Sequence, residues 1–100
     1  MSIDPNQIRL EGAAASGRYI YRFADGSEAE MAYAARQPGV VTITNTGTPP
    51  RHRGQGVAAA LVAKAVADFR TAGLKVVPAC WFAREQFDAH PDWADLLHQS

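Results

Sequence analysis

Residues 48–58 read Thr-Pro-Pro-Arg-His-Arg-Gly-Gln-Gly-Val-Ala, and this stretch decides how the rest of the chain is interpreted. Before it, residues 40–44 are rich in β-branched side chains, which favour a strand. After it, residues 57–69 place apolar side chains at helical spacing. The stretch is therefore predicted to join a strand to the start of the longest helix.

A loop in this position can hold an anion. Gly54 and Gly56 let backbone N–H groups come close to a ligand, and a helix start adds unpaired N–H donors and a partial positive charge. Arg51 and Arg53 supply full positive charges beside them. These residue types indicate a phosphate or diphosphate site, although the same glycines would also suit a simple tight turn.

Alternating apolar and polar residues dominate the first half of the chain, with turn signals at Asp25-Gly26 and Pro38-Gly39. We therefore expect an antiparallel meander in this half. The expected strands cover residues 8–10, as a short edge strand, and residues 18–23, 28–33 and 40–44.

The second half changes to a helical period. The expected elements are a helix from residue 57 that ends at Ala72-Gly73, a strand over 74–77, a helix over 83–90, and a short helix capped by Asp92 that ends at Leu97. A strand, a helix and a further strand in succession indicate a crossover. The fold class is thus predicted as α/β (α+β), with the order β-β-β(-β)-α-β-α and a mixed, mainly antiparallel sheet.

Composition limits what the chain can be. Its 100 residues suit one domain, which we place at residues 17–98 after a lead-in over residues 1–16. Ten Lys and Arg balance ten Asp and Glu, so general attraction to nucleic acid or to an anionic membrane is not expected. Nineteen residues are Ala, which predicts a core with few large side chains.

A single cysteine, Cys80, excludes an internal disulfide framework and a multi-cysteine zinc site, and three scattered histidines suggest no metal. No stretch approaches the roughly 20 apolar residues of a transmembrane helix, and the first residues lack the basic and apolar parts of a secretory signal. We expect a cytoplasmic protein, a monomer or small oligomer, with no metal, membrane or nucleic-acid partner.

Three phosphate-binding motifs compete for the glycine loop. A Walker A loop needs Lys and then Ser or Thr after its last glycine, and these are absent here. Gly54-x-Gly56-x-x-Ala59 fits a dinucleotide fingerprint, but that reading requires a carboxylate after the next strand, and residues 74–79 contain none. The third pattern, Arg/Gln-x-x-Gly-x-Gly/Ala, is matched directly by Arg51-x-x-Gly54-x-Gly56.

This third pattern binds the diphosphate of coenzyme A in the GCN5-related N-acetyltransferases, and the chain resembles the minimal, single-domain subgroup of that superfamily from Gly17 to Leu97. The stretches that carry the resemblance are Gly17-Arg18-Tyr19, Thr46-x-x-Pro49, Arg53 to Ala58, Val77 to Phe82 and His90-Pro91-Asp92-Trp93. The resemblance implies an acetyl-CoA-binding fold in which the loop joins the fourth strand to the main helix, so residues 8–10 would supply the missing strand. The coenzyme contacts that it implies are Thr46, Thr48, Arg51, Arg53, Gly54, Gln55, Gly56 and Val57.

The chain departs from the family pattern just before the loop. The family usually carries His-Thr there, often followed by Glu, and either a His or a Glu could act as a general base. This sequence has Asn45-Thr46-Gly47 instead. Asn45 cannot titrate and Gly47 has no side chain, so a base at these positions is absent.

Cys80 is the candidate nucleophile, because the resemblance places a cysteine at this position and a covalent acetyl-cysteine route has been suggested for the subgroup. The alternative is a buried thiol that packs as a small hydrophobic group. His52 and His90 are the candidate bases that could ionise it. Trp81 and Phe82 could wall a substrate pocket, but packing in a small core is the expectation for both.

These observations favour a single-domain acyltransferase that uses acetyl-CoA and passes the acetyl group to an amine on a small molecule or a protein. A non-catalytic module that binds CoA or acyl-CoA is the alternative, since the chain lacks an evident base and is small. A purely structural partner protein is a third hypothesis, under which the phosphate motif would be a coincidence.

Overall fold

The computed structural model describes residues 4–13 and 15–98, so residues 1–3 and 14 of the expected lead-in lie outside the described part. Five strands form one sheet in the order of the sequence, with β1 to β4 antiparallel and β4 parallel to β5. The strands are β1 (Arg9–Gly12), β2 (Ser16–Arg22), β3 (Glu28–Gln37), β4 (Val40–Gly47) and β5 (Lys75–Pro78), and the α-helices are α1 (Val57–Thr71) and α2 (Trp81–Ala89). The predicted mixed α/β architecture is confirmed. With β1 included, four strands precede the glycine loop, as the family resemblance implied.

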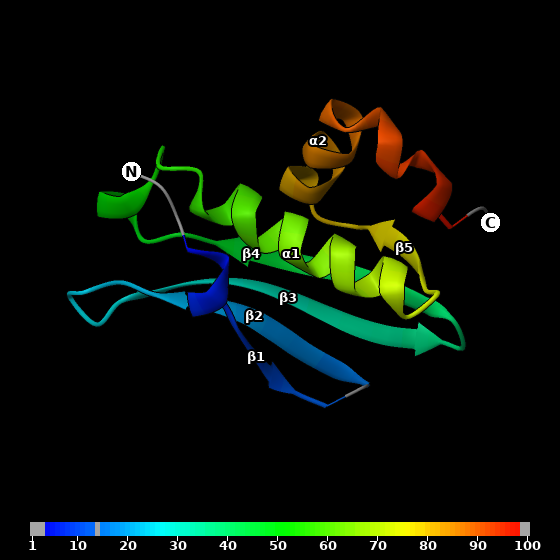
Figure 1. Cartoon of the computed structure of the whole chain (residues 1–100), viewed down its shortest axis with the longest axis horizontal. Coiled ribbons are helices and arrows are strands. Elements are labelled where there is room, and N and C mark those ends of the chain that lie inside the picture. The colour runs from blue at the N-terminus through cyan, green and yellow to red at the C-terminus, as the bar shows by residue number, and fades with distance from the viewer. Residues whose placement is uncertain (1–3, 14, 99–100) are drawn as a thin grey trace.

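Helix α1 covers one face of the sheet (Figure 1). Its apolar side, which includes Leu61, Val62 and Phe69, packs against side chains that point inward from the strands, among them Tyr19 and Met31. The alternation read from β2 and β3 therefore does set which residues enter this core. The helix ends at Thr71, and Gly73 follows at φ +74°, as the Ala72-Gly73 pair predicted.

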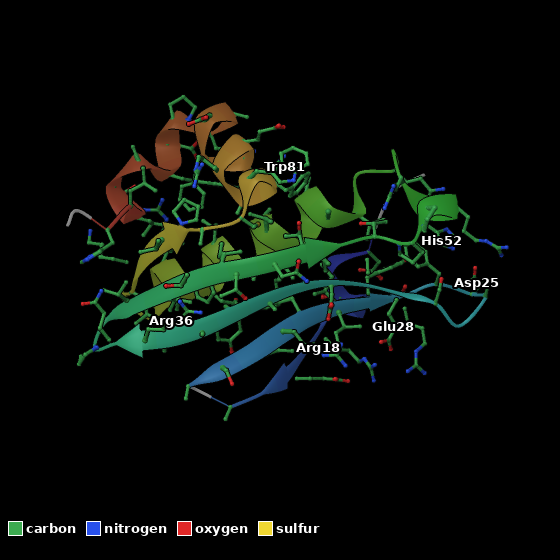
Figure 2. The ribbon with its side chains drawn as sticks, turned by 180° about the vertical axis from the view of Figure 1, so that it is seen from behind. Arg18, Asp25, Glu28, Arg36, His52 and Trp81 are labelled. Atoms are coloured by element: carbon green, nitrogen blue, oxygen red, sulfur yellow. The ribbon has the colours of Figure 1, made fainter. Side chains whose placement is uncertain are left out.

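The other face of the sheet carries ion pairs, and no described helix covers it (Figure 2). Arg18 contacts Glu30 at 2.8 Å, and Arg22 contacts Glu28 at 2.9 Å. Between these pairs lies Ile20, which is opposite Glu30 in the register and is 0% exposed. The arginine and glutamate stems thus bury an isoleucine on the face that alternation assigned to polar residues.

Strands β4 and β5 part after four residue pairs, the last of which is Ile43 with Pro78. The Ile43 carbonyl accepts hydrogen bonds from the N–H groups of both Ala79, at 3.1 Å, and Cys80, at 3.3 Å. The described residues of β4 beyond this point, 44–47, pair only with β3. A bulge at residue 44 separates the Ala32–Asn45 and Tyr33–Ile43 pairs, and bulges of this kind bend a strand. One edge of β4 is therefore open beside the glycine loop.

The C-terminal elements differ from the sequence prediction in two places. Helix α2 begins at Trp81 rather than residue 83, because Cys80 occupies the N-cap position. Asp92 was expected to cap the last helix, but it lies within the first turn of a 3-10 helix, Pro91–Leu96, whose N-cap is His90 without a side-chain bond. That prediction was wrong because Pro91, with its fixed φ and no N–H to cap, starts the helix two residues before the start that a cap at Asp92 requires.

Candidate functional site

The glycine loop has the backbone geometry that an anion site needs. Gly54 lies at φ +81° and Gly56, the N-cap of α1, lies at φ +79°. A Cβ atom placed on either glycine would meet nothing within 4 Å, so the space in front of the backbone is open. Val57 starts α1 directly afterwards, which leaves the first N–H groups of the helix without intrahelical acceptors. The loop can therefore present several N–H donors to one phosphate group.

A groove of about 460 Å³ lies beside the glycine loop, with Arg53 and Ala58, on either side of the glycines, in its lining. It lies between the end of β4, the start of α1 and the start of α2. Its lining residues are Thr46, Gly47, Thr48, Arg53, Ala58, Trp81 and Phe82. The groove thus brings together three of the predicted coenzyme contacts, Thr46, Thr48 and Arg53. The other predicted site residues, Arg51, Gly54, Gln55, Gly56, Val57 and Cys80, are not among those that line it.

Trp81 projects from the start of α2 at the rim of this groove (Figure 2) and is 69% exposed. The expectation that it packs in the core was wrong, because the N-terminal turn of α2 points its first residue away from the core. Phe82 is partly buried against the core and meets the Trp81 ring edge to face, with centroids 6.1 Å apart. The groove therefore has one aromatic wall and one polar wall.

The two arginines of the loop have partners within the protein, whereas Gln55 does not use its side-chain oxygen among the described residues. Arg51 Nη1 donates to Asp25 Oδ2 at 3.2 Å, so its charge faces the β2–β3 turn rather than standing alone. Arg53 Nε donates to the carbonyl of Thr48 at 3.3 Å, which closes the loop on itself while the guanidinium lines the groove. The Gln55 side-chain oxygen is buried and has no hydrogen-bond partner in the described part of the chain.

Cys80 lies at the head of α2, where its Sγ accepts a hydrogen bond from the Ala83 N–H at 3.4 Å. The side chain is half-buried against the core. His90 stands at the far end of α2, about 15 Å along the helix from Cys80, and stacks on Trp93. His52 is bonded to Asp25. Neither histidine is among the hydrogen-bond partners of Cys80 in the described residues.

A second hollow, of about 370 Å³, lies on the opposite face of the sheet and was not predicted from the sequence. Its lining residues are Arg18, Glu28, Glu30, Gly47, Thr48 and Pro49. Gly47 and Thr48 line both hollows, so the end of β4 forms the partition between them. The Arg22 guanidinium, which bonds Glu28, lowers the pKa of that carboxyl and keeps it ionised.

Two further findings concern metal binding and membrane crossing. No group of three or more His, Cys, Asp or Glu side chains gathers in a metal-binding arrangement within residues 4–13 and 15–98. Over the same residues, no helix has the length and apolar character that crossing a membrane requires.

Comparisons with known proteins identify a family and a similar fold. A family model described as GCN5-related N-acetyl-transferase matches residues 18–96. The fold is similar to the NMR solution structure of a "GCN5-like putative N-acetyltransferase" from Staphylococcus aureus, with a TM-score of 0.68 and 20% sequence identity over 94% of this chain and 91% of that one. No protein with curated annotation matches the chain.

Proposed function

The chain belongs to the GCN5-related N-acetyltransferase family, and we propose that it transfers an acetyl group from acetyl-CoA to an amine. One observation carries the proposal. The open backbone of Gly54 and Gly56 stands between Arg53 and Ala58, and these two residues line one groove together with the end of β4 and the head of α2.

The diphosphate of acetyl-CoA would bind at the loop. The N–H groups around Gly54, Gly56 and Val57 would donate to its oxygens, and the start of α1 would add the positive end of a helix dipole. The Arg53 guanidinium, which lines the same groove, supplies a full positive charge. Neutral backbone donors and a nearby cation together suit a ligand that carries several negative charges.

The pantetheine arm would follow the open edge of β4. It is a chain of amides, and residues 44–47 offer backbone groups that have no β5 partner. The aromatic wall formed by Trp81 and Phe82 would cover its apolar carbons. N–H groups at the bulged end of β4 are the candidates to polarise the thioester carbonyl, as in an oxyanion hole.

The transfer itself has two possible routes that differ in what attacks the thioester. In the direct route the amine nitrogen bonds to the carbonyl carbon, the carbon–sulfur bond breaks, and the CoA thiolate takes up the proton that the amine loses. In the covalent route the Cys80 thiolate attacks first, the carbon–sulfur bond to CoA breaks, and CoA leaves as a thiolate. The amine then attacks the acetyl-cysteine carbonyl, the carbon–Sγ bond breaks, and the departing Cys80 thiolate takes up the proton that the amine loses. Since Asn45 and Gly47 supply no base, the covalent route has the advantage that a thiol is partly ionised near neutral pH.

The acceptor amine would approach from the hollow on the opposite face. That hollow and the groove share Gly47 and Thr48, so an acceptor there would face the donor across the end of β4. The absence of a side chain at Gly47 leaves this partition thin. The acceptor is accordingly proposed to be a small molecule or an exposed amine of a protein, because the hollow is shallow and open.

A non-catalytic CoA-binding module is the second candidate. The residues that favour it are Asn45, which is exposed and cannot titrate, and Gly47, which has no side chain. Such a protein would bind acetyl-CoA in the same groove without turnover.

A thiol-release assay separates the two functions. The purified chain is mixed with acetyl-CoA and a panel of primary amines, and free CoA is followed with a thiol reagent while acetylated amine is identified by mass spectrometry. Transfer predicts amine-dependent release of CoA that matches the acetylated product one for one. Saturable acetyl-CoA binding without release in the presence of any amine would favour the binding module.

A further inference from the structure

A cluster outside the groove ties the glycine loop to the β2–β3 turn. Asp25, in that turn, accepts hydrogen bonds at Oδ2 from two consecutive loop residues. Arg51 Nη1 lies 3.2 Å away and His52 Nε2 lies 3.0 Å away. Asp25 and His52 therefore lie together at one end of the sheet, although 27 positions separate them in the sequence (Figure 2).

The Asp25 carboxylate is itself held in place. Its other oxygen, Oδ1, accepts hydrogen bonds from the N–H of Ser27 at 2.9 Å and from the hydroxyl of Ser27 at 2.6 Å. The turn is closed by the N–H of Gly26, which donates to the carbonyl of Phe23, and by a bond between Phe23 and Ser27. The Asp25 carboxylate, which the loop contacts, is thus held in one position within the β2–β3 hairpin.

His52 adds a packing contact to these hydrogen bonds. Its ring stacks on the ring of Phe23, with centroids 3.7 Å apart and an interplanar angle of 3°. Phe23 is only 6% exposed and belongs to the core. The histidine is therefore held on one face by the core and at Nε2 by Asp25.

The segment between Pro49 and Arg53 connects His52, which Asp25 and Phe23 hold in place, to the loop glycines. It forms a 3-10 turn, in which the His52 N–H donates to Pro49 and the Arg53 N–H donates to Pro50. Gly54 follows directly, and α1 begins three residues later. The glycine segment is thus held on one side by α1 and on the other by the contacts of Asp25.

We propose that Asp25 is a positioning residue for the diphosphate of acetyl-CoA, an inference that rests on the proposed function. It acts through His52 and Arg51, which fix where the N–H groups of Gly54 and Gly56 stand relative to the sheet. Preorganised donors bind an anion without the cost of ordering them, and small misplacements of a binding group are costly. Removing Asp25 also frees the Arg51 guanidinium, which by itself would strengthen diphosphate binding, so the two effects have opposite signs.

The test compares two ligands that share the thioester but differ in phosphate. Dissociation constants for acetyl-CoA and for S-acetylpantetheine, which has no phosphate, are measured by NMR titration. The variants are Asp25→Ala and His52→Phe, the second of which keeps a ring on Phe23 but loses the bond to Asp25. Asp95→Ala is the matched control, because Asp95 accepts two bonds from Arg70 at 2.7 and 3.2 Å on a different part of the surface.

The expected result is acetyl-CoA affinity that falls roughly ten- to hundredfold in both variants, with S-acetylpantetheine affinity within twofold of wild type and the Asp95→Ala control unchanged. Equal losses for both ligands would overturn the inference and assign Asp25 a general structural role. Acetyl-CoA binding as tight as or tighter than wild type in Asp25→Ala would also overturn it. Failure of the wild type to bind acetyl-CoA would instead reject the proposed function, and this inference with it.

Discussion

Ile43 of β4 and Pro78 of β5 are the last residues that pair between these parallel strands, and both chain segments that follow them, at 46–48 and 81–82, line the groove. The Ile43 carbonyl takes the N–H groups of both residues that follow Pro78, which turns the chain away from β4 and into α2. Because the chain leaves β4 at this point, one edge of β4 has no strand beside it, and α2 begins next to that edge. The groove thus exists because β4 and β5 separate after this pair.

The loop glycines are expected to be needed for their backbone conformation and for open space. Gly56→Ala should weaken CoA binding at least tenfold, because a methyl group would stand where the phosphate approaches and the positive φ costs about 1–2 kcal/mol for any other residue. Isothermal titration calorimetry with CoA measures this loss.

Gly39→Ala is the matched control for this experiment. Gly39 has φ +75°, close to the +79° of Gly56, and a methyl group added there would also meet nothing within 4 Å, but it lies in the β3–β4 turn. Its substitution should lower stability by a similar amount and leave CoA affinity unchanged. Equal CoA affinity for wild type and Gly56→Ala would remove the loop from the site.

Trp81 should report directly on ligand in the groove. It is 69% exposed at the rim, whereas the other tryptophan, Trp93, is buried. Covering the Trp81 indole with acetyl-CoA should shift the tryptophan fluorescence to shorter wavelength. The shift should be lost in Trp81→Phe and kept in Trp93→Phe; the opposite pattern would place the ligand elsewhere.

Cys80→Ser tests the covalent route. The substitution removes the thiolate while it nearly conserves size and the ability to accept the Ala83 N–H at the head of α2. Intact-protein mass spectrometry after mixing with acetyl-CoA should show a hydroxylamine-sensitive acetyl adduct on wild type and none on the variant. Full turnover by Cys80→Ser would assign the cysteine to packing and leave the direct route.

Protonation of the Asp25 carboxylate, which should weaken its contacts with Arg51 and His52, is expected only at low pH. Hydrogen bonds from the Ser27 hydroxyl and N–H, and then from His52, hold the pKa of Asp25 well below its usual range. A depressed folded pKa gives stability that is present above the unfolded value, about 3.9, and that is lost as pH falls through the folded value. The difference in Tm between wild type and Asp25→Asn should therefore have its full value at and above about pH 5 and shrink between about pH 4 and pH 2. A difference that stays undiminished at pH 2 would contradict this assignment.

Ile20 should behave as a core residue despite its place on the charged face. Ile20→Ala is expected to cost roughly 2–5 kcal/mol of unfolding free energy, as for other buried aliphatic side chains. Arg18→Ala, which removes the surface ion pairs of Arg18 with Glu11 and Glu30, should cost under about 1 kcal/mol. Urea denaturation measures both, and a cost below 1 kcal/mol for Ile20→Ala would mean that the ion pairs do not shield it.

Local pattern was enough to predict the architecture, because strand alternation, the helical period and the glycine-rich loop are all read from neighbouring residues. The strand over residues 8–10 could be inferred for the same reason and corresponds to β1. The burial of Ile20 could not, since it depends on which arginines of β2 meet which glutamates of β3.

In the candidate site, too, the part formed by neighbouring residues could be predicted and the part formed by distant residues could not. The glycine motif located the anion loop from six consecutive residues, whereas the partner of Arg51 lies 26 positions away in a turn that the sequence marks only as a turn. The exposure of Trp81 was missed because an aromatic residue in a small domain is usually buried, and only the start of α2 at residue 81 turns it outward.

The most direct test of the proposed acetyl-CoA site is an NMR titration of the uniformly labelled chain with acetyl-CoA, followed through its backbone amides. If acetyl-CoA binds as proposed, saturable shifts will cluster at residues 44–48, 53–58 and 80–82, which form the open edge of β4, the glycine loop and the head of α2. No saturable shift, or shifts confined to other parts of the sheet, would contradict the proposed site.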